Sequence, residues 1–378
     1  MKITYAVPVE LDAAKGGNVQ HVLGICRNAS KSGIQIKLIC LKGQNSIPKE
    51  DFHIVTMDSQ GMGAFERILK FSKFALSEIK NNHKPDWIYL RPFPLDYLLF
   101  TRHLKKMNLK FAYELNTLWA NELRSQGKEL KAHIYPWFEA KSIKEASALF
   151  PVTQEISEHA SSVGGLNIPT LVAGNGIDIP NLPKESKKEI RRKWNLPVDK
   201  KLAVMAGFTR PWHGCDKLIA SLALVPNDLH VVLIGAENEQ VKINTIKTSE
   251  KYGVNNRVHI LPWLNHAEVS EIVYACDFGI SPLAKEIMKM KEAQSLKVRH
   301  YLAMGIPVLI AGGETKEVLD SKFTYQVKDT SAEEIKVGLL HLQNVQYQPE
   351  EIRDFARSKL SWDSIAAKTF SFMKEMSF

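Results

Sequence analysis

The chain has 378 residues, of which 44% are hydrophobic and 24% are charged, a composition typical of a folded globular protein rather than a disordered one. The formal net charge of +9 indicates an anionic partner but does not choose among nucleic acid, an anionic membrane and a phosphorylated substrate. No apolar run approaches the ~20 residues that span a bilayer. The four cysteines have neither zinc-site nor redox spacing, so we expect reduced thiols and a cytoplasmic protein.

Short apolar runs alternate with segments of helical period along the whole chain, which predicts parallel sheets flanked by helices. The strands expected in the first half are Ile3–Val7, Gln35–Leu41, His53–Thr56, Trp87–Leu90, Phe111–Glu114 and Leu149–Val152. Those expected in the second half are Ala203–Ala206, His230–Ile234, His259–Leu261, Phe278–Ser281, Pro307–Ile310 and Thr324–Val327. Patterned helices are expected at Val19–Ser32, Ala267–Ala275 and Ala332–Leu342. Right-handed crossovers would then lay helices on both faces of each sheet.

A linker near residue 180 divides the chain almost equally, because glycine and proline interrupt the pattern across Asn175–Pro183. A charged helix is expected to follow from about Glu185. Its basic run Lys187–Lys193 is interleaved with acid and has no aromatic residues for base stacking. We therefore favour a solvated helix face over a nucleic-acid site.

The segment Phe65–Leu76 is both basic and aromatic, and two interpretations of it remain open. It could lie on an anionic bilayer as an amphipathic interfacial helix. It could equally pack its apolar face on a sheet, which we favour. Peripheral contact with an anionic membrane is kept as a hypothesis.

Paired glycines precede the first helix in the loop Lys15–Asn18, and His21 follows within that helix. Gly16 and Gly17 would let the backbone approach a ligand closely, and a helix N-terminus favours an anion. A tight turn without a ligand explains the same residues equally well, since the full dinucleotide-binding pattern is missing.

The second half carries a stronger pattern at the end of the strand Ala203–Ala206, where the run Gly207–Asp216 leads into a helix. Arg210 and His213 would lie at the carboxyl edge of the sheet, where open α/β sheets bind ligands. Arg210 offers a permanently charged guanidinium that can bind phosphate through two hydrogen bonds. His213 offers a group that can donate a proton or change its charge near neutral pH.

A second anion-binding element is expected in the run Glu292–Val308. A helix should begin near Ser295 and end at a Gly305 C-cap. The amides of Ser295, Leu296 and Lys297 would then be free to bind an anion, with the helix dipole reinforcing them. Together with the Gly207–Asp216 run, this predicts a diphosphate site in the second half.

Over essentially its whole length the chain resembles the retaining GT-B glycosyltransferases of family four. The resemblance is carried by Gly16-Gly17 with His21-Val22, Asn175–Asp178, the spacing of Gly207 to Gly214, and Ala303–Val308. It implies an α/β GT-B fold with two Rossmann-like domains facing each other across a cleft. Residues 1–178 would form the acceptor-side domain, 179–358 the nucleotide-sugar-binding domain, and 359–378 a C-terminal helix crossing back to the first domain.

The resemblance also implies roles for individual residues. Catalytic roles fall on Glu292, which would face the donor sugar, on Arg210, and on Asn116, which stands where the family often has a histidine. The donor site would comprise Gly17, Gly207, Arg210, His213, Gly235, Pro262, Glu292, Ser295, Leu296, Lys297 and His300, and the acceptor side Gly16, Gly17 and His21.

Three positions depart from the family pattern. Phe208 replaces the usual phosphate-binding arginine, for which Arg210 would compensate, and His213 replaces a lysine, for which a protonated imidazole would compensate. His300 replaces a glutamate that binds the ribose. A ribose contact and a packing role both remain open for His300, because an imidazole cannot hold two hydroxyls with carboxylate strength.

The expected reaction moves a sugar from a nucleotide-sugar to an acceptor hydroxyl with retention, in polysaccharide, glycolipid or cell-surface glycan synthesis. The sequence has no Asp-x-Asp run, so we expect no metal and no cofactor other than the donor. The acceptor would be a glycan, a lipid-linked or a small molecule. The alternative is a catalytically degenerate sugar-nucleotide binder or partner subunit.

Overall fold

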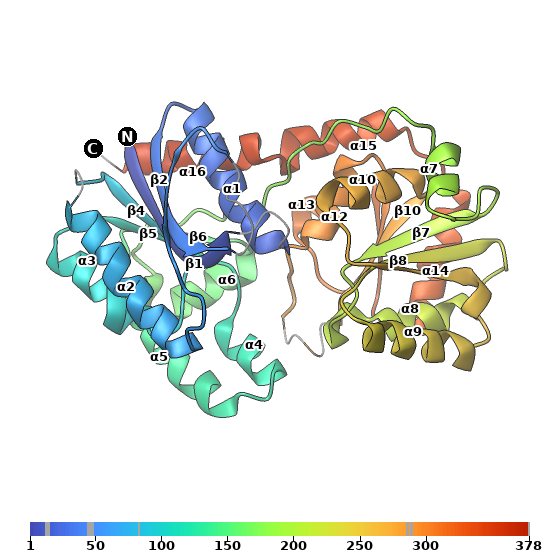
Figure 1. Ribbon diagram of the computed structural model, residues 1–378, viewed down its shortest axis with the longest axis horizontal. Helices are drawn as coiled ribbons and strands as arrows, with labels where there is room; N and C mark the ends of the chain where they lie inside the picture. The colour runs from blue at the N-terminus through green and yellow to red at the C-terminus, as the bar shows by residue number, and fades with distance from the viewer. Residues whose placement is uncertain (12–15, 44–48, 82–83, 285–286, 288–289, 377–378) are drawn as a thin grey trace. The chain divides into compact units, whose positions relative to one another are not determined.

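The computed structural model describes residues 1–11, 16–43, 49–81, 84–284, 287 and 290–376 (Figure 1). The chain forms two compact units. The first unit comprises Met1–Gly176 and Trp362–Phe378, and the second comprises Ile177–Ser361. Lys15, part of the predicted glycine loop, and residues 285, 286, 288 and 289 of the basic loop after Pro282 lie outside the described residues.

The first unit is built on a six-stranded parallel sheet with the order β3-β2-β1-β4-β5-β6. Its strands are β1 (Lys2–Leu11), β2 (Gln35–Lys42), β3 (His53–Met57), β4 (Trp87–Leu90), β5 (Phe111–Leu115) and β6 (Ala148–Pro151). Its helices are α1 (Gly16–Lys31), α2 (Ala64–Asn81), α3 (Arg102–Lys106), α4 (Trp119–Ser125), α5 (Glu129–Glu145), α6 (Gln154–Ala160) and α16 (Trp362–Glu375). All six predicted strands of this half are confirmed, with ends shifted by a few residues.

The helices α1 and α16 pack side by side on one face of this sheet, and α2, α3 and α5 cover the other (Figure 1). Both faces are therefore buried, which explains why the central strands are continuous apolar runs rather than alternating ones. The predicted helix Val19–Ser32 in fact begins at Gly16. Gly16 and Gly17 thus form the first turn of α1 instead of the loop before it, which corrects the expectation.

The second unit repeats the plan with the strand order β12-β11-β10-β7-β8-β9, again all parallel. Its strands are β7 (Lys201–Ala206), β8 (Leu229–Ala236), β9 (Val258–Pro262), β10 (Phe278–Pro282), β11 (Val308–Ala311) and β12 (Thr324–Val327). Its helices are α7 (Lys187–Lys193), α8 (Cys215–Leu222), α9 (Glu239–Lys251), α10 (His266–Ala275), α12 (Leu296–Ala303), α13 (Lys316–Leu319), α14 (Ala332–Asn344) and α15 (Pro349–Phe355).

Successive residues of β7 point to opposite layers of this second sheet, as the pleat requires. Leu202 and Val204 join the cluster under α10, α12 and α15, whereas Ala203 and Met205 join the one under α8 and α14. The six strands predicted for this half are confirmed, and so is the α/β class of both units. Among the described residues, none of the helices combines the length and the apolar character that a membrane span needs.

Trp362, the first residue of α16, is almost fully buried in the first unit and packs edge-on against the ring of His21 at 5.1 Å. A Cβ added at Gly24 or at Gly176 would collide with the Trp362 indole. Both glycines are therefore required by close packing, and the indole fixes α16 against α1.

Replacing Trp362 with alanine should lower the free energy of unfolding of the first unit by about 3–5 kcal/mol, because the cavity cannot collapse around two glycines. Urea denaturation measures this. Trp263→Ala is the matched control, since that indole is 52% exposed and its loss should change stability by less than about 0.5 kcal/mol. Equal effects of the two substitutions would contradict this packing account.

Candidate active site

The loop after β7 is shaped by two glycines with left-handed backbone, Gly207 (φ 64°) and Gly214 (φ 66°). Gly214 precedes α8, and a Cβ there would collide with the carbonyl oxygen of Pro282 at the end of β10. A Cβ added at Gly235, near the end of β8, would lie 3.7 Å from the Cα of Gly207. The carboxyl ends of β7, β8 and β10 therefore converge, and Pro262 ends β9 at the same edge of the sheet.

Three basic side chains meet at this edge. Lys297, in the first turn of α12, is partly buried, and its Nζ donates to the carbonyl oxygen of Gly207 over 3.0 Å. Burial lowers the pKa of Lys297 to about 8. Burial, then the charges of Lys297 and Arg210, lower the pKa of His213 to about 3. Arg210 itself is exposed, and no carboxylate among the described residues contributes to either shift.

The His213 imidazole is therefore neutral near pH 7 in the ligand-free protein, which corrects the expected protonated imidazole. Its Nδ1 is buried and has no hydrogen-bond partner among the described residues. A buried polar nitrogen without a partner is costly to keep. A bound anion would give the His213 imidazole a hydrogen-bond acceptor, and its negative charge would balance the positive charges of Arg210 and Lys297.

The N-terminus of α12 is partly occupied by a side chain that sequence reasoning missed. The amide of Ser295 donates to Oε2 of Glu314 over 3.1 Å, so the expectation that this amide is free is wrong. Leu296 and Lys297 supply further first-turn amides, which a helix cannot satisfy by itself. Glu292 lies half-buried just ahead of them, with its Cα 3.3 Å from where a Cβ at Gly313 would be.

Phe208 and His300, two of the positions that depart from the family pattern, are both buried in the second unit. Phe208 is only 3% exposed and belongs to the apolar cluster under α8 and α14. His300 is buried on α12, where its Nε2 lies 2.9 Å from the hydroxyl of Ser270 and its ring stacks on His266. Burial, and then His266, lower the pKa of His300 to about 3. The ribose contact of His300 stays a prediction, and it would have to use Nδ1 or displace Ser270.

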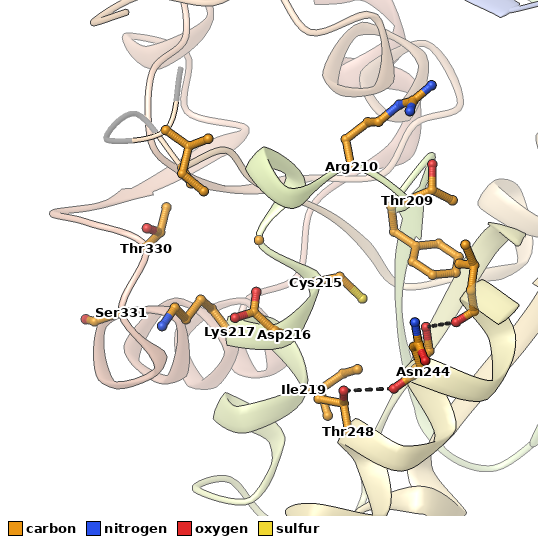
Figure 2. Close-up of a pocket in the computed structure, with 16 residues that line it drawn as sticks. Thr209, Arg210, Cys215, Asp216, Lys217, Ile219, Asn244, Thr248, Thr330 and Ser331 are labelled. Carbon is orange, nitrogen blue, oxygen red and sulfur yellow. Dashed lines mark hydrogen bonds between the residues drawn. The ribbon is translucent and has the colours of Figure 1, made fainter. Parts of the chain in front are cut away.

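A cavity of about 660 Å³ borders this site on the side of α8, α9 and α14 (Figure 2). It shares Thr209, Arg210 and Gly214 with the β7–α8 loop, but His213, Lys297 and Glu292 do not line it. Figure 2 shows the Arg210 side chain directed away from Asp216 and Lys217. We place the candidate anion site at the basic group rather than in this cavity, because unbalanced charge specifies a ligand and volume does not.

The first unit carries a different polar cluster at the carboxyl ends of β4 and β5. Nε2 of His21 lies 2.8 Å from Oε1 of the buried Glu114, and the Asn116 amide donates to the same oxygen over 2.6 Å. Nε of Arg91 donates to Asn116 over 2.9 Å. Burial raises the pKa of Glu114, but His21, then Arg91 and Asn116, outweigh it and lower the value to about 2.

This cluster joins two predicted residues, His21 and Asn116, with two that were not singled out, Arg91 and Glu114. Arg91 directly follows a predicted strand and Glu114 ends another. Polar residues at the carboxyl ends of adjacent parallel strands are the signal that could have found them.

Matches with known proteins agree with this architecture. The family model described as Glycosyltransferase Family 4 matches residues 15–180, and the family model described as Glycosyl transferases group 1 matches residues 186–359. The sucrose-phosphate synthase of Thermosynechococcus elongatus has the same fold, with a TM-score of 0.77 and 15% identity over 99% of this chain and 98% of that one. Anabaena Alr3699/HepE in complex with UDP and glucose superposes with a TM-score of 0.75 and 15% identity, covering 99% of this chain and all 100% of that one.

Two six-stranded parallel sheets, each covered by helices on both faces, thus give the chain the GT-B fold of these structures. The chain belongs to glycosyltransferase family 4, with the group 1 glycosyltransferase domain in its second half. A D-inositol 3-phosphate glycosyltransferase from Xylanimonas cellulosilytica is 25% identical over 193 residues, which is 48% of this chain and 45% of that protein. That match spans less than half of the relative's length.

Nucleoside diphosphate binding should weaken above pH 8, because Lys297 is protonated below its pKa of about 8 and loses its charge as the pH rises through that value. The affinity for UDP should fall by up to about tenfold between pH 7 and pH 9. Calorimetric titration at several pH values measures this. In Lys297→Met the affinity should be lower and independent of pH over this range. A mutant that keeps the wild-type pH profile would show that another group titrates.

Proposed function

We propose that this glycosyltransferase moves a sugar from a nucleoside diphosphate donor to an acceptor hydroxyl with retention at the anomeric carbon, and without a metal ion. The unbalanced basic group of Arg210, His213 and Lys297 carries this proposal. A diphosphate is the ligand whose charge and oxygen acceptors match two cationic groups and a neutral imidazole beside a helix N-terminus. UDP is the first nucleoside diphosphate to test, since Anabaena Alr3699/HepE is solved in complex with UDP and glucose.

In this proposal the bond between the anomeric carbon and the β-phosphate oxygen breaks while the carbon bonds to the acceptor oxygen. The acceptor's proton leaves with the diphosphate or to water. Arg210 and Lys297, with the amides of Leu296 and Lys297, stabilise the charge that develops on the leaving group. Glu292 orients the donor sugar, and the cluster around His21, Glu114 and Asn116 orients the acceptor.

A sugar-nucleotide binder without transferase activity is the second candidate. It is favoured by the burial of Phe208 in the core and by the engagement of His300 with Ser270, since the usual ligand contacts at these two positions are altered. Such a protein would bind the nucleotide at the same basic group and would turn nothing over.

Arg210→Ala, which removes a group that stabilises transition-state charge, and Glu292→Ala, which removes the group that orients the donor sugar, should each lower the rate of UDP release from UDP-sugars by about 10²–10³-fold. A coupled assay with a panel of acceptors measures the release. Arg192→Ala and Glu333→Ala are the matched controls, because both side chains are exposed in the second unit and belong to other helices. UDP binding without turnover under any condition would favour the second candidate, and failure to bind UDP or any other nucleoside diphosphate would refute both.

Membrane contact is also proposed, but at a different surface from the one expected. On α2, Phe71, Ala75 and Ile79 are buried, so its apolar face packs inside the unit as the alternative interpretation held. The helix α5 instead exposes Leu130 (75%), Ile134 (44%) and Trp137 (56%).

These three α5 residues are spaced to share one helix face. The Lys141 ammonium lies 5.4 Å from the centre of the Trp137 ring, and Lys131 is exposed beside Leu130. An apolar stripe flanked by lysines suits the interface of an anionic bilayer, which would also hold a lipid-linked acceptor.

Leu130→Ser combined with Trp137→Ser should abolish sedimentation with vesicles of phosphatidylcholine and phosphatidylglycerol, and 0.5 M salt should weaken the wild-type binding. Trp263→Ser, an exposed tryptophan of the second unit, is the control for loss of an indole. Neutralising Lys70 and Lys73 on α2 should change little. Binding that depends on α2 and not on α5 would overturn this assignment.

A further inference from the structure

Glu314 is the most completely enclosed carboxylate beside the candidate donor site. Its side chain is fully buried and receives three donors: the amide of Ser295 at 3.1 Å, the amide of Thr315 at 2.9 Å, and NH1 of Arg299 at 3.2 Å. Arg299 is itself buried, and its NH1 also donates to the carbonyl oxygen of Ser295 over 3.1 Å. The ion pair therefore holds Ser295, the N-cap of α12, by both its amide and its carbonyl.

The same loop supports the segment that carries Glu292. A Cβ at Gly313 would collide with the carbonyl oxygen of Lys291 and lie 3.3 Å from the Cα of Glu292. A Cβ at Gly312, whose φ is 122°, would collide with the carbonyl oxygen of Leu283. The run 312–315 thus packs closely against the backbone of neighbouring segments. Within this run, the Glu314 carboxylate accepts a hydrogen bond from the amide of Ser295, the N-cap of α12.

Stability alone is a poor explanation for this pair. Burial raises the pKa of Glu314, and the charge of Arg299 only opposes that shift. Removing both charges from water is expensive, and well-packed apolar residues often stabilise as much as a buried ion pair does. What the pair supplies is directionality, because its hydrogen bonds hold both the amide and the carbonyl of Ser295.

We propose that Glu314 and Arg299 are positioning residues for the donor. They hold the N-terminus of α12 and the Glu292 segment in one geometry, and Glu314 removes the Ser295 amide from the set available to the diphosphate. The diphosphate is thereby directed to the next amides, those of Leu296 and Lys297. This inference rests on the proposed function, since it assigns the pair to the same donor site.

Two variants, Glu314→Ala and Arg299→Lys, test the pair, and Glu314→Gln tests rescue because an amide oxygen can still accept from Ser295. The first two should raise the Kd for UDP and the KM for the donor by about tenfold while leaving the acceptor KM unchanged. Glu314→Gln should recover most of the loss. Amide hydrogen exchange across 291–297, measured without nucleotide, should quicken in the first two variants only.

The matched control is Asp277→Asn, which breaks the partly buried ion pair between Arg191 NH2 and Asp277 Oδ2 (3.0 Å) elsewhere in the second unit. It should lower Tm while leaving the UDP Kd and the exchange of 291–297 unchanged. If Glu314→Ala lowers only Tm, as Asp277→Asn does, the positioning role is refuted. If the Glu314 variants do not fold, Gly313→Ala keeps the pair but displaces the Glu292 segment, and an unchanged donor KM there would also refute it.

Failure of the proposed function would look different. In that case wild-type protein would not bind UDP or any other nucleoside diphosphate. Faster exchange of 291–297 in Glu314→Ala would still show that the pair orders this segment, and unchanged exchange would refute the inference on its own.

Discussion

The partly buried ammonium group of Lys297 donates a hydrogen bond to the carbonyl oxygen of Gly207, and this contact connects the two segments on which the candidate donor site depends. It ties the first turn of α12 to the loop that leaves β7. The described residues place two further basic groups beside it, Arg210 and His213, and supply no carboxylate that shifts the pKa of Lys297 or His213. Concentrated charge of one sign together with perturbed pKa values is typical of a functional site.

The equivalent edge of the first sheet is arranged in the opposite way. There the buried carboxylate of Glu114 is surrounded by His21, Asn116 and Arg91, so charge is balanced within the protein. A balanced polar cluster suits a neutral, hydroxyl-bearing ligand, since its groups can exchange partners without a net change of charge. An unbalanced basic one suits a polyanion. Two units of the same topology thus present different chemistry, as expected when function resides in the site rather than in the fold.

Most of the fold could be predicted from the sequence because its signals are local. Each strand is a short apolar run bounded by turn residues, and the pattern located all twelve strands to within a few residues. The donor loop was also located locally, through Gly207 and Gly214, whose backbone conformations suit glycine. The start of α1 was misjudged because glycine has low helix propensity, whereas Gly16 and Gly17 are helical in the structure.

The errors at the site have a common cause, which is contact between residues far apart in sequence. Glu314 reaches Ser295 across 19 positions, so the amide that looked free is occupied. The protonation of His213 depends first on its burial and then on Lys297, neither of which is visible in its neighbours along the chain. Arg91 gains meaning only when β4 and β5 lie side by side. Local patterns thus find the elements that carry a site, and long-range packing decides its charge.

The most direct test of the basic donor site is amide hydrogen exchange with and without a nucleoside diphosphate, using UDP first. The account predicts protection of the segments 207–216 and 291–304, with the cavity wall formed by Asn244 and Thr248 unchanged. Protection confined to α9 and to Thr330–Ser331 would place the nucleotide in the neighbouring cavity instead and would contradict the assignment to Arg210, His213 and Lys297.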